Sequence, residues 1–158
     1  MEITSIDFSA YGTLYNMTDG GVSTGNVNHW SGPGYEDINT TGPLIDTLGY
    51  LGHTRGSGTP FTVEAMERHM HTQEALFCTN QPIVFAVAAY SADPPRVEDI
   101  VPVILRPGYT AVLHRGTWHS SAHGLDGEAW YHYLALVYFN EPTVLLMPQD
   151  GPFNVFHP

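Results

Sequence analysis

The sequence predicts an all-β domain, a sandwich or a small barrel, with little helix. Glycine (16) and proline (12) are spread along the 158 residues rather than gathered in one linker, which favours many short strands joined by turns. Seven or more strand-like segments follow one another at short spacing. Helical periodicity is weak: residues 63–70 could form one turn of helix, but their histidines favour an extended chain.

Eight segments are predicted to be strands because apolar and β-branched residues dominate or alternate in them. In chain order they are 47–53, 61–71, 75–79, 82–90, 99–108, 110–116, 129–139 and 143–148. In the second segment, Phe61 and Val63 alternate with polar residues. Residues 82–90, "PIVFAVAAY", form a continuous apolar run that suits a buried strand. The strongest prediction is 129–139, "AWYHYLALVYF".

The least regular stretch is 20–42, "GGVSTGNVNHWSGPGYEDINTTG". We interpret it as a long loop or flap with a short strand inside it. Such a flap either closes over a site or joins a dimer partner, and the sequence does not decide between the two. No internal repeat or low-complexity tract divides the chain, so residues 1–158 are predicted to form a single domain.

The charge of the chain excludes several functions. The formal net charge is -11, and the five basic residues are all arginine. An acidic surface repels phosphate backbones, so no nucleic-acid partner is expected, and the absence of lysine excludes mechanisms that need a Schiff-base lysine. No apolar run approaches the roughly 20 residues of a membrane helix, and the start of the chain lacks a signal-peptide pattern. We therefore expect a cytoplasmic protein without a membrane partner.

The cysteine and the histidines carry different information. Cys78 alone cannot form an internal disulfide, and its apolar neighbours favour a strand residue over a nucleophile.

Nine histidines are present, and seven lie between positions 53 and 132. If their segment is a strand, His69 and His71 share one face. Two imidazoles in that arrangement can hold a divalent cation at about 2.0–2.1 Å.

A carboxylate and a third histidine would complete such a metal site. In a straight strand, Glu74 would point away from His71, whereas Gln73 would share the face of the histidines. A bulge or turn after His71 would restore Glu74. Both Glu74 and Gln73 therefore stay open as candidate ligands.

The third histidine is suggested by residues 108–123, "GYTAVLHRGTWHSSAH". The spacing of Gly108, Gly116 and His119 resembles the second motif of the cupin superfamily, with His114 in place of a proline. The first cupin motif, His-x-His followed by Glu, is nearly met, with a gap of two residues where three or four are usual. The resemblance implies a double-stranded β-helix (jelly-roll) barrel. It also implies a divalent metal (Zn, Mn, Ni or Fe) held by His69, His71, Glu74 and His119.

Further segments resemble the ureidoglycolate lyase family, which has a cupin fold. They are "FSAYG" (8–12), "GHTRG" with "PFTVEAMERH" (52–69), and "HRGTWH" (114–119), in the same order as in the family. With these motifs the resemblance covers essentially the whole chain. It implies a lyase, a homodimer of purine catabolism, that cleaves ureidoglycolate or a related small 2-hydroxy acid to glyoxylate and urea or a similar leaving group. After "ERH" the family usually continues Gly-Thr/Ser-Gln, whereas this chain has "MHTQE".

The resemblance also implies roles for individual residues. The substrate would be a small anion, and an arginine can pair with its carboxylate in a bidentate manner. The candidate catalytic residues are Arg55, Glu67, Arg68, His114 and His132. The candidate substrate-binding residues are Arg55, Arg115 and Trp118. Structural roles stay open for three of them: His132 at the end of a packed strand, Arg115 in a surface ion pair, and Trp118 as a core anchor.

Two other functions fit the same residues. A metal-dependent cupin oxygenase or isomerase acting on a small anionic metabolite would use a similar set of ligands. A non-catalytic binding protein is the third possibility, but unpaired imidazoles inside a barrel are costly without a function.

Overall fold

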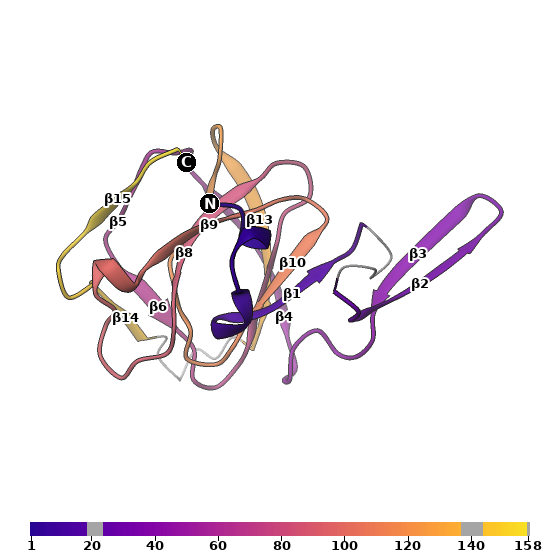
Figure 1. Cartoon of the computed structure of the whole chain (residues 1–158), viewed down its shortest axis with the longest axis horizontal. Coiled ribbons are helices and arrows are strands. Elements are labelled where there is room, and N and C mark those ends of the chain that lie inside the picture. Colours follow the sequence, from indigo (N-terminus) through magenta and orange to yellow (C-terminus); the bar gives the residue numbers. More distant parts are fainter. Residues whose placement is uncertain (19–23, 137–143, 158) are drawn as a thin grey trace.

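The protein is built from two antiparallel sheets with the main hydrophobic core between them (Figure 1). The computed structural model describes residues 1–18, 24–136 and 144–157. The first sheet has five strands in the order β1 (Gly12–Asn16), β10 (Tyr109–Leu113), β7 (Glu74–Phe77), β13 (Ala129–Ala135) and β4 (Tyr50–Gly56). All of its pairings are antiparallel.

The second sheet has six strands. Five follow in the order β12 (His123–Gly124), β8 (Ile83–Ala88), β11 (Trp118–His119), β6 (Met66–Arg68) and β14 (Val144–Leu146), and β9 (Val101–Leu105) also pairs with β8. Two smaller pairs are β5 (Phe61–Val63) with β15 (Phe153–Val155), and β2 (Val27–Gly32) with β3 (Tyr35–Thr40).

The helical content of the described residues is limited to short 3-10 turns, at Ile3–Ser5, Phe8–Ala10 and Val97–Asp99. Within the described part of the chain, no helix is long and apolar enough to cross a membrane. The fold class expected from the sequence, an all-β jelly-roll barrel with little helix, is confirmed.

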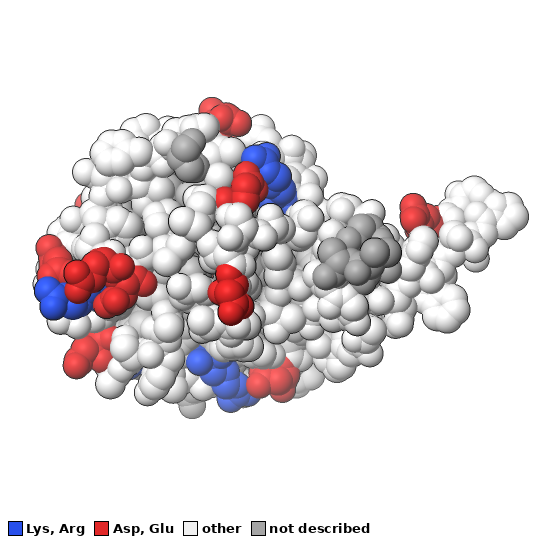
Figure 2. Space-filling view, in the orientation of Figure 1, with Lys and Arg blue, Asp and Glu red and all other residues white. Residues whose placement is uncertain are grey.

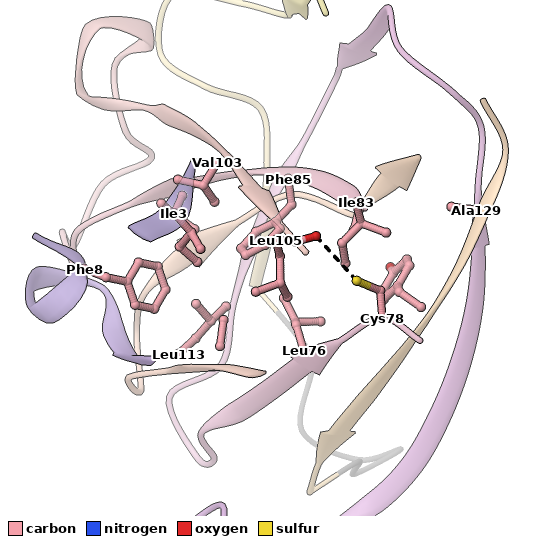
Figure 3. Packing of buried hydrophobic residues seen from close by; sticks show 14 residues of the cluster. Ile3, Phe8, Leu76, Cys78, Ile83, Phe85, Val103, Leu105, Leu113 and Ala129 are labelled. Carbon is pink, nitrogen blue, oxygen red and sulfur yellow. Dashed lines mark hydrogen bonds between the residues drawn. The ribbon is translucent and has the colours of Figure 1, made fainter. Parts of the chain in front are cut away.

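The core between the sheets contains side chains from both of them (Figure 3). Leu76 and Leu113 come from the five-stranded sheet, and Phe85 and Leu105 come from the other. Cys78 lies just after β7, and its thiol donates to the Leu105 carbonyl oxygen over 3.4 Å, as Figure 3 shows. Burial raises the pKa of the Cys78 thiol to about 11, so this residue remains an uncharged thiol in the core.

The predicted strand at 61–71 is interrupted. It forms β5 and β6, separated at Glu64 and Ala65, and β6 ends at Arg68. Residues 69–73 then turn before β7 begins. Two hydrogen bonds help to fix this turn: the Gly116 amide donates to the His69 carbonyl over 2.8 Å, and the Thr72 hydroxyl donates to the Gln73 carbonyl over 2.6 Å.

The stretch 20–42, expected to be a long loop or flap with one short strand, contains two strands. β2 and β3 form a hairpin of two six-residue strands that projects from the body of the protein (Figure 1). The turn between them contains Pro33 and Gly34, and Gly34 has φ 83°, a conformation that favours glycine. Residues 20–23 of the predicted flap lie outside the described residues.

Candidate active site

A cavity of about 270 Å³ is the centre of the candidate site. Its walls come from β4, β6, β7 and β13 and from the turn after β6. The lining residues are Thr54, Glu67, His69, His71, Glu74, Ser121, Tyr131, Tyr133, Ala135 and Leu136. The described wall is therefore rich in imidazole, carboxylate and hydroxyl groups.

Four acidic and imidazole side chains of the described chain contact one another beside this cavity, and three of them, Glu67, His69 and Glu74, line it. His69 Nε2 lies 2.9 Å from Glu74 Oε2, and His119 Nε2 lies 3.8 Å from the same oxygen. His119 Nδ1 is 3.7 Å from Glu67 Oε1. The candidate ligand atoms of Glu67, His69 and His119 all lie within 4.8 Å of one another. The two histidine clusters of the sequence thus converge, with 5.2 Å between the ring centroids of His69 and His119.

Strand pairing explains why these side chains meet. In the register of β6 and β11, His119 is directly opposite Glu67, so both side chains point to the same face. The turn at 69–73 then brings His69 and Glu74 together, although Glu74 would have pointed away from the histidines in a straight strand. The sequence predicted that Glu74 could join the histidines only if a bulge or turn followed His71, and the structure has this turn.

Within the cluster, burial and the neighbouring charges act in opposite directions on the pKa values of His69 and Glu74. Burial disfavours the charged form of His69, but the hydrogen bond to Glu74 and the charges of Glu74 and Glu67 outweigh it, so the pKa of His69 is raised. Burial likewise opposes ionisation of Glu74, yet His119 and His69 together hold the pKa of Glu74 below its ordinary value. The arrangement therefore favours an ionised carboxylate surrounded by imidazoles.

His119 provides a test of whether a metal fits these residues. Its side chain is buried, at 2% exposure, and its Nε2 atom has no hydrogen-bond partner among the described residues. A buried polar atom without a partner is costly, whereas a lone pair aimed at a metal is satisfied. Imidazole and carboxylate together suit Zn²⁺, Mn²⁺, Fe²⁺ or Ni²⁺. The group of Glu67, His69 and His119 could therefore hold a metal ion.

Two other candidate ligands are placed differently. His71 lines the cavity, but its Nε2 is 3.0 Å from the Leu136 carbonyl oxygen, and its ring centroid lies 6.0 Å from that of His69. His71 is thus beside the cluster rather than within it. The Gln73 side-chain oxygen accepts a hydrogen bond from the Asp46 amide over 3.0 Å, so Gln73 is directed away from the cluster.

Arg68 and Trp118 lie on the far side of their strands from the cavity. Because side chains alternate along a strand, they face away from Glu67 and His119, their neighbours in sequence. The Arg68 guanidinium lies 4.6 Å from the Trp118 ring and 5.5 Å from the Tyr90 ring, and it donates to the Ser91 carbonyl oxygen. Trp118 is fully buried. This placement does not support a catalytic role for Arg68 or a substrate-binding role for Trp118.

Arg55 and His132 lie on the outer face of the five-stranded sheet. Their neighbours Thr54, Tyr131 and Tyr133 line the cavity, so alternation directs Arg55 and His132 outward. Arg55 is 3.6 Å from Glu128, and the His132 ring stacks on His53 with 4.3 Å between centroids. We therefore do not retain either residue as catalytic.

His114 and Arg115 are exposed in the turn after β10 and are not part of the cavity wall. Arg115 donates to Asp46 over 3.0 Å, which is the surface ion pair that the sequence left open. The remaining arginines, Arg96 and Arg106, also pair with surface carboxylates. All five arginines belong to the described residues, and none lines the cavity.

Four hydroxyl-bearing residues of the cavity wall were not predicted: Thr54, Ser121, Tyr131 and Tyr133. The alternation within "AWYHYLA" could have identified both tyrosines, because they share one face of the strand. Burial is the main reason why the pKa of Tyr131 is raised, so its hydroxyl stays protonated and can donate a hydrogen bond.

No curated protein matches the chain. A solved structure of dTDP-4-dehydrorhamnose 3,5-epimerase from Elizabethkingia anophelis NUHP1 is 8% identical, with a TM-score of 0.48, over 80% of this chain and 70% of the other. A dTDP-6-deoxy-D-glucose-3,5-epimerase from Legionella pneumophila Philadelphia 1 is 10% identical, with a TM-score of 0.44, over 82% and 70%. A family model described as ureidoglycolate lyase matches residues 2–141.

Proposed function

Because this chain belongs to the ureidoglycolate lyase family, we propose that it cleaves ureidoglycolate to glyoxylate and urea in a metal-assisted elimination. The observation that supports the metal part of the proposal is the cluster of Glu67, His69 and His119 beside the cavity, in which the buried His119 has a nitrogen without a hydrogen-bond partner among the described residues. The cavity, at about 270 Å³, is smaller than the roughly 300–1,000 Å³ of sites for drug-sized ligands, which suits a small metabolite.

The charge of the cavity supports the need for a bound cation. The substrate carries a carboxylate, yet the chain has no lysine and no arginine lines the cavity. Glu67 and Glu74 make the described wall acidic, which would repel an anion. A divalent ion held by Glu67, His69, Glu74 and His119 would supply the positive charge, orient the substrate and lower the pKa of its hydroxyl group.

We assign proton transfer to His71. His71 lines the cavity, its Nε2 donates to the Leu136 carbonyl oxygen over 3.0 Å, and imidazole is the side chain that most often acts as a general acid and base. His71 would take the hydroxyl proton of the substrate while the carbon–oxygen double bond forms and the carbon–nitrogen bond breaks. The same proton would pass to the departing nitrogen, so urea leaves and His71 returns to its starting state.

The hydroxyl groups of the wall would orient the substrate. Thr54, Tyr131 and Tyr133 present neutral donors to the same cavity. Neutral donors can bind the ureido carbonyl or a carboxylate oxygen without adding charge to the site. We include a homodimer, a cytoplasmic location and a role in purine catabolism in the proposal, on the strength of the family resemblance.

The test is glyoxylate release from racemic ureidoglycolate. The enzyme is assayed as purified, after removal of metal by a chelator, and after each candidate ion is added back. We expect activity to be lost on chelation and to return with one ion. His71→Gln should lower kcat by about 10²–10⁴-fold while metal content is unchanged. His114→Gln, at an exposed histidine outside the cavity, is the matched control and should leave kcat unchanged.

Two results would overturn the proposal. Glyoxylate release at an undiminished rate from fully metal-free enzyme would remove the metal from the reaction. Bound iron with oxygen consumption on a small organic acid, and no glyoxylate from ureidoglycolate, would instead favour the cupin oxygenase.

A further inference from the structure

The exposed arginines of the protein are paired with carboxylates. In Figure 2 the blue groups lie beside red ones, and Arg96, Arg106 and Arg115 each form an ion pair with a carboxylate. The buried polar and charged side chains of the described chain are Asn16, Thr72, Glu74, Thr117, His119 and Ser120. Among them, Thr72 directly follows His71, the residue to which we assign proton transfer, in the turn before β7.

Thr72 uses the full hydrogen-bonding capacity of its hydroxyl group. The residue is 1% exposed, and its Oγ1 donates to the Gln73 carbonyl over 2.6 Å and accepts from the Leu136 amide over 3.1 Å. The Thr47 hydroxyl lies 2.9 Å from the same atom. A hydroxyl has one proton to donate, and that of Thr72 is directed at Gln73, so Thr47 is the donor to Thr72. One donated and two accepted hydrogen bonds therefore fix the Thr72 hydroxyl in place.

Leu136 connects Thr72 to His71. The described pairing of β13 with β7 and β4 ends at Ala135, so Leu136 lies just beyond it. The Leu136 amide donates to Thr72 Oγ1, and the Leu136 carbonyl oxygen accepts from His71 Nε2 over 3.0 Å. Backbone groups that leave a sheet need other partners of this kind. Two consecutive side chains of the turn thus hold the amide and the carbonyl of one residue.

The contact with Leu136 orients the His71 ring. Both residues line the cavity, and a hydrogen bond from a ring nitrogen helps to set the direction of the ring and the nitrogen that carries the proton. A shift of the Leu136 carbonyl would turn the ring or break this hydrogen bond. Thr72 itself does not line the cavity. Its hydroxyl can therefore influence the reaction through Leu136 and His71 without touching the substrate.

We propose that Thr72 is a positioning residue, which holds the Leu136 backbone so that the Leu136 carbonyl keeps the His71 ring directed for proton transfer. The proposal rests on the proposed role of His71. Displacement of a catalytic group by about 1 Å can lower a rate by about 10²-fold. Substrate binding should change little when the hydroxyl is removed, because Thr72 is not part of the cavity wall.

Steady-state kinetics of the metal-loaded enzyme test the proposal. Thr72→Val keeps the shape of the side chain but removes the hydroxyl, and should lower kcat by roughly 10–100-fold with KM nearly unchanged. Thr72→Ser retains the hydroxyl and should restore kcat to near the wild-type value. The matched control is Thr59→Val. The Thr59 hydroxyl also donates to a backbone carbonyl over 2.6 Å, that of Leu125, but Thr59 does not line the cavity, so kcat and KM should stay unchanged.

Nuclear magnetic resonance observes the His71 ring without relying on activity. The protein is labelled with ¹⁵N-histidine and loaded with Zn²⁺, and the His71 resonance is assigned by its absence in His71→Gln. The Nε2 proton should exchange slowly with water, because it is donated to a carbonyl. Thr72→Val should shift or broaden this resonance, whereas Thr72→Ser and Thr59→Val should leave it in place. Circular dichroism establishes that each variant is folded.

A second substitution covers the case in which Thr72→Val does not fold. Thr72→Cys then takes its place, because a thiol is a weak donor and a weak acceptor. It should change kcat and the His71 resonance in the same direction, by a smaller amount.

Three results would overturn the proposal. They are an unchanged kcat in the folded hydroxyl-deficient variant, a lowered kcat with an unchanged His71 resonance, and a failure of Thr72→Ser to restore kcat. If the wild-type enzyme releases no glyoxylate from ureidoglycolate, the proposed function fails separately. The resonance then decides alone: its change in Thr72→Val supports the positioning of His71, and its persistence overturns it.

Discussion

Arg68 illustrates how the surroundings of a side chain decide its role. Its guanidinium lies over two aromatic rings and donates to a backbone carbonyl, on the side of β6 that faces away from the cavity. Arginine stacked in this way contributes about 2 kcal/mol when it is desolvated. Arg68 is also partly buried, so the side chain can contribute through packing as well as through its charge.

We therefore expect Arg68→Ala to lower the free energy of unfolding by about 2 kcal/mol, measured by urea denaturation. The KM for ureidoglycolate should be unchanged, because Arg68 does not line the cavity. Arg96→Ala, at an exposed arginine, serves as the control and should change stability by less than about 0.5 kcal/mol. A large rise in KM at unchanged stability would return Arg68 to the list of substrate-binding residues.

His123 gives a prediction for pH. Burial lowers its pKa below 6.5, an effect that contact with Ser57 only partly offsets, and its ring stacks on Phe61 at 3.8 Å. Below about pH 6.5 the unfolded chain therefore binds a proton at this position more readily than the folded chain, so stability falls on acidification. His123→Gln should lose less stability than the wild type between pH 7.5 and 5.5, as measured by urea midpoints. An equal loss in both proteins would contradict this assignment.

At the scale of elements, the turn before β11 contacts the segment that carries His69. Gly116 has φ 81°, and its amide donates to the His69 carbonyl over 2.8 Å. A Cβ added there would lie 2.5 Å from a ring atom of Tyr90. The same glycine thus allows the turn and fixes the segment that carries His69.

Gly116→Ala should therefore cost about 1 kcal/mol or more in stability, because alanine disfavours a positive φ. It should also weaken metal binding by disturbing His69, which isothermal titration with the active ion would detect. Gly151→Ala is a matched control: Gly151 has φ 93°, but a Cβ there meets nothing within 4 Å. If both variants bind metal alike, Gly116 has only a conformational role.

The apolar strands were predictable from the sequence because burial leaves a strong signal. Each of the eight predicted segments overlaps at least one strand, and the run at 82–90 contains β8, whose residues are all buried. Only one short strand was predicted in the region of β2 and β3, because most of their residues are exposed, which leaves no alternation of apolar and polar residues. Only the "GPG" turn between them indicated a hairpin.

The part of the candidate site that depends on the two histidine motifs was predictable. His119 and Glu67 lie opposite each other because β11 pairs with β6, and the resemblance of both motifs to those of cupins indicated that the two segments come together. The arginines were misplaced because a motif does not record which way a strand faces. Arg55 follows Thr54 and Arg68 follows Glu67, and both Thr54 and Glu67 line the cavity. Because side chains alternate along a strand, the two arginines point to the opposite side of their sheets.

For the whole molecule, metal binding and folding should be coupled. The unfolded chain does not assemble Glu67, His69 and His119, so an ion that binds the folded state stabilises it. At one hundred times the Kd, the added ion should contribute about 2.7 kcal/mol. For a domain of this size, that corresponds to a rise in Tm of roughly 5–10 °C.

Differential scanning calorimetry with and without the ion measures this effect. His119→Ala should abolish the rise in Tm, whereas His114→Ala, at an exposed histidine, should preserve it. A rise of equal size in both variants would mean that the ion stabilises the fold from another place.

β13 presents a different surface on each side. Tyr131, Tyr133 and Ala135 face the cavity, and Trp130 and His132 stack with His53 on the reverse side. Substitutions could therefore tune either side independently during evolution. Insertion or deletion of one codon within this strand would instead turn every following side chain over, and would spoil both sides in a single event.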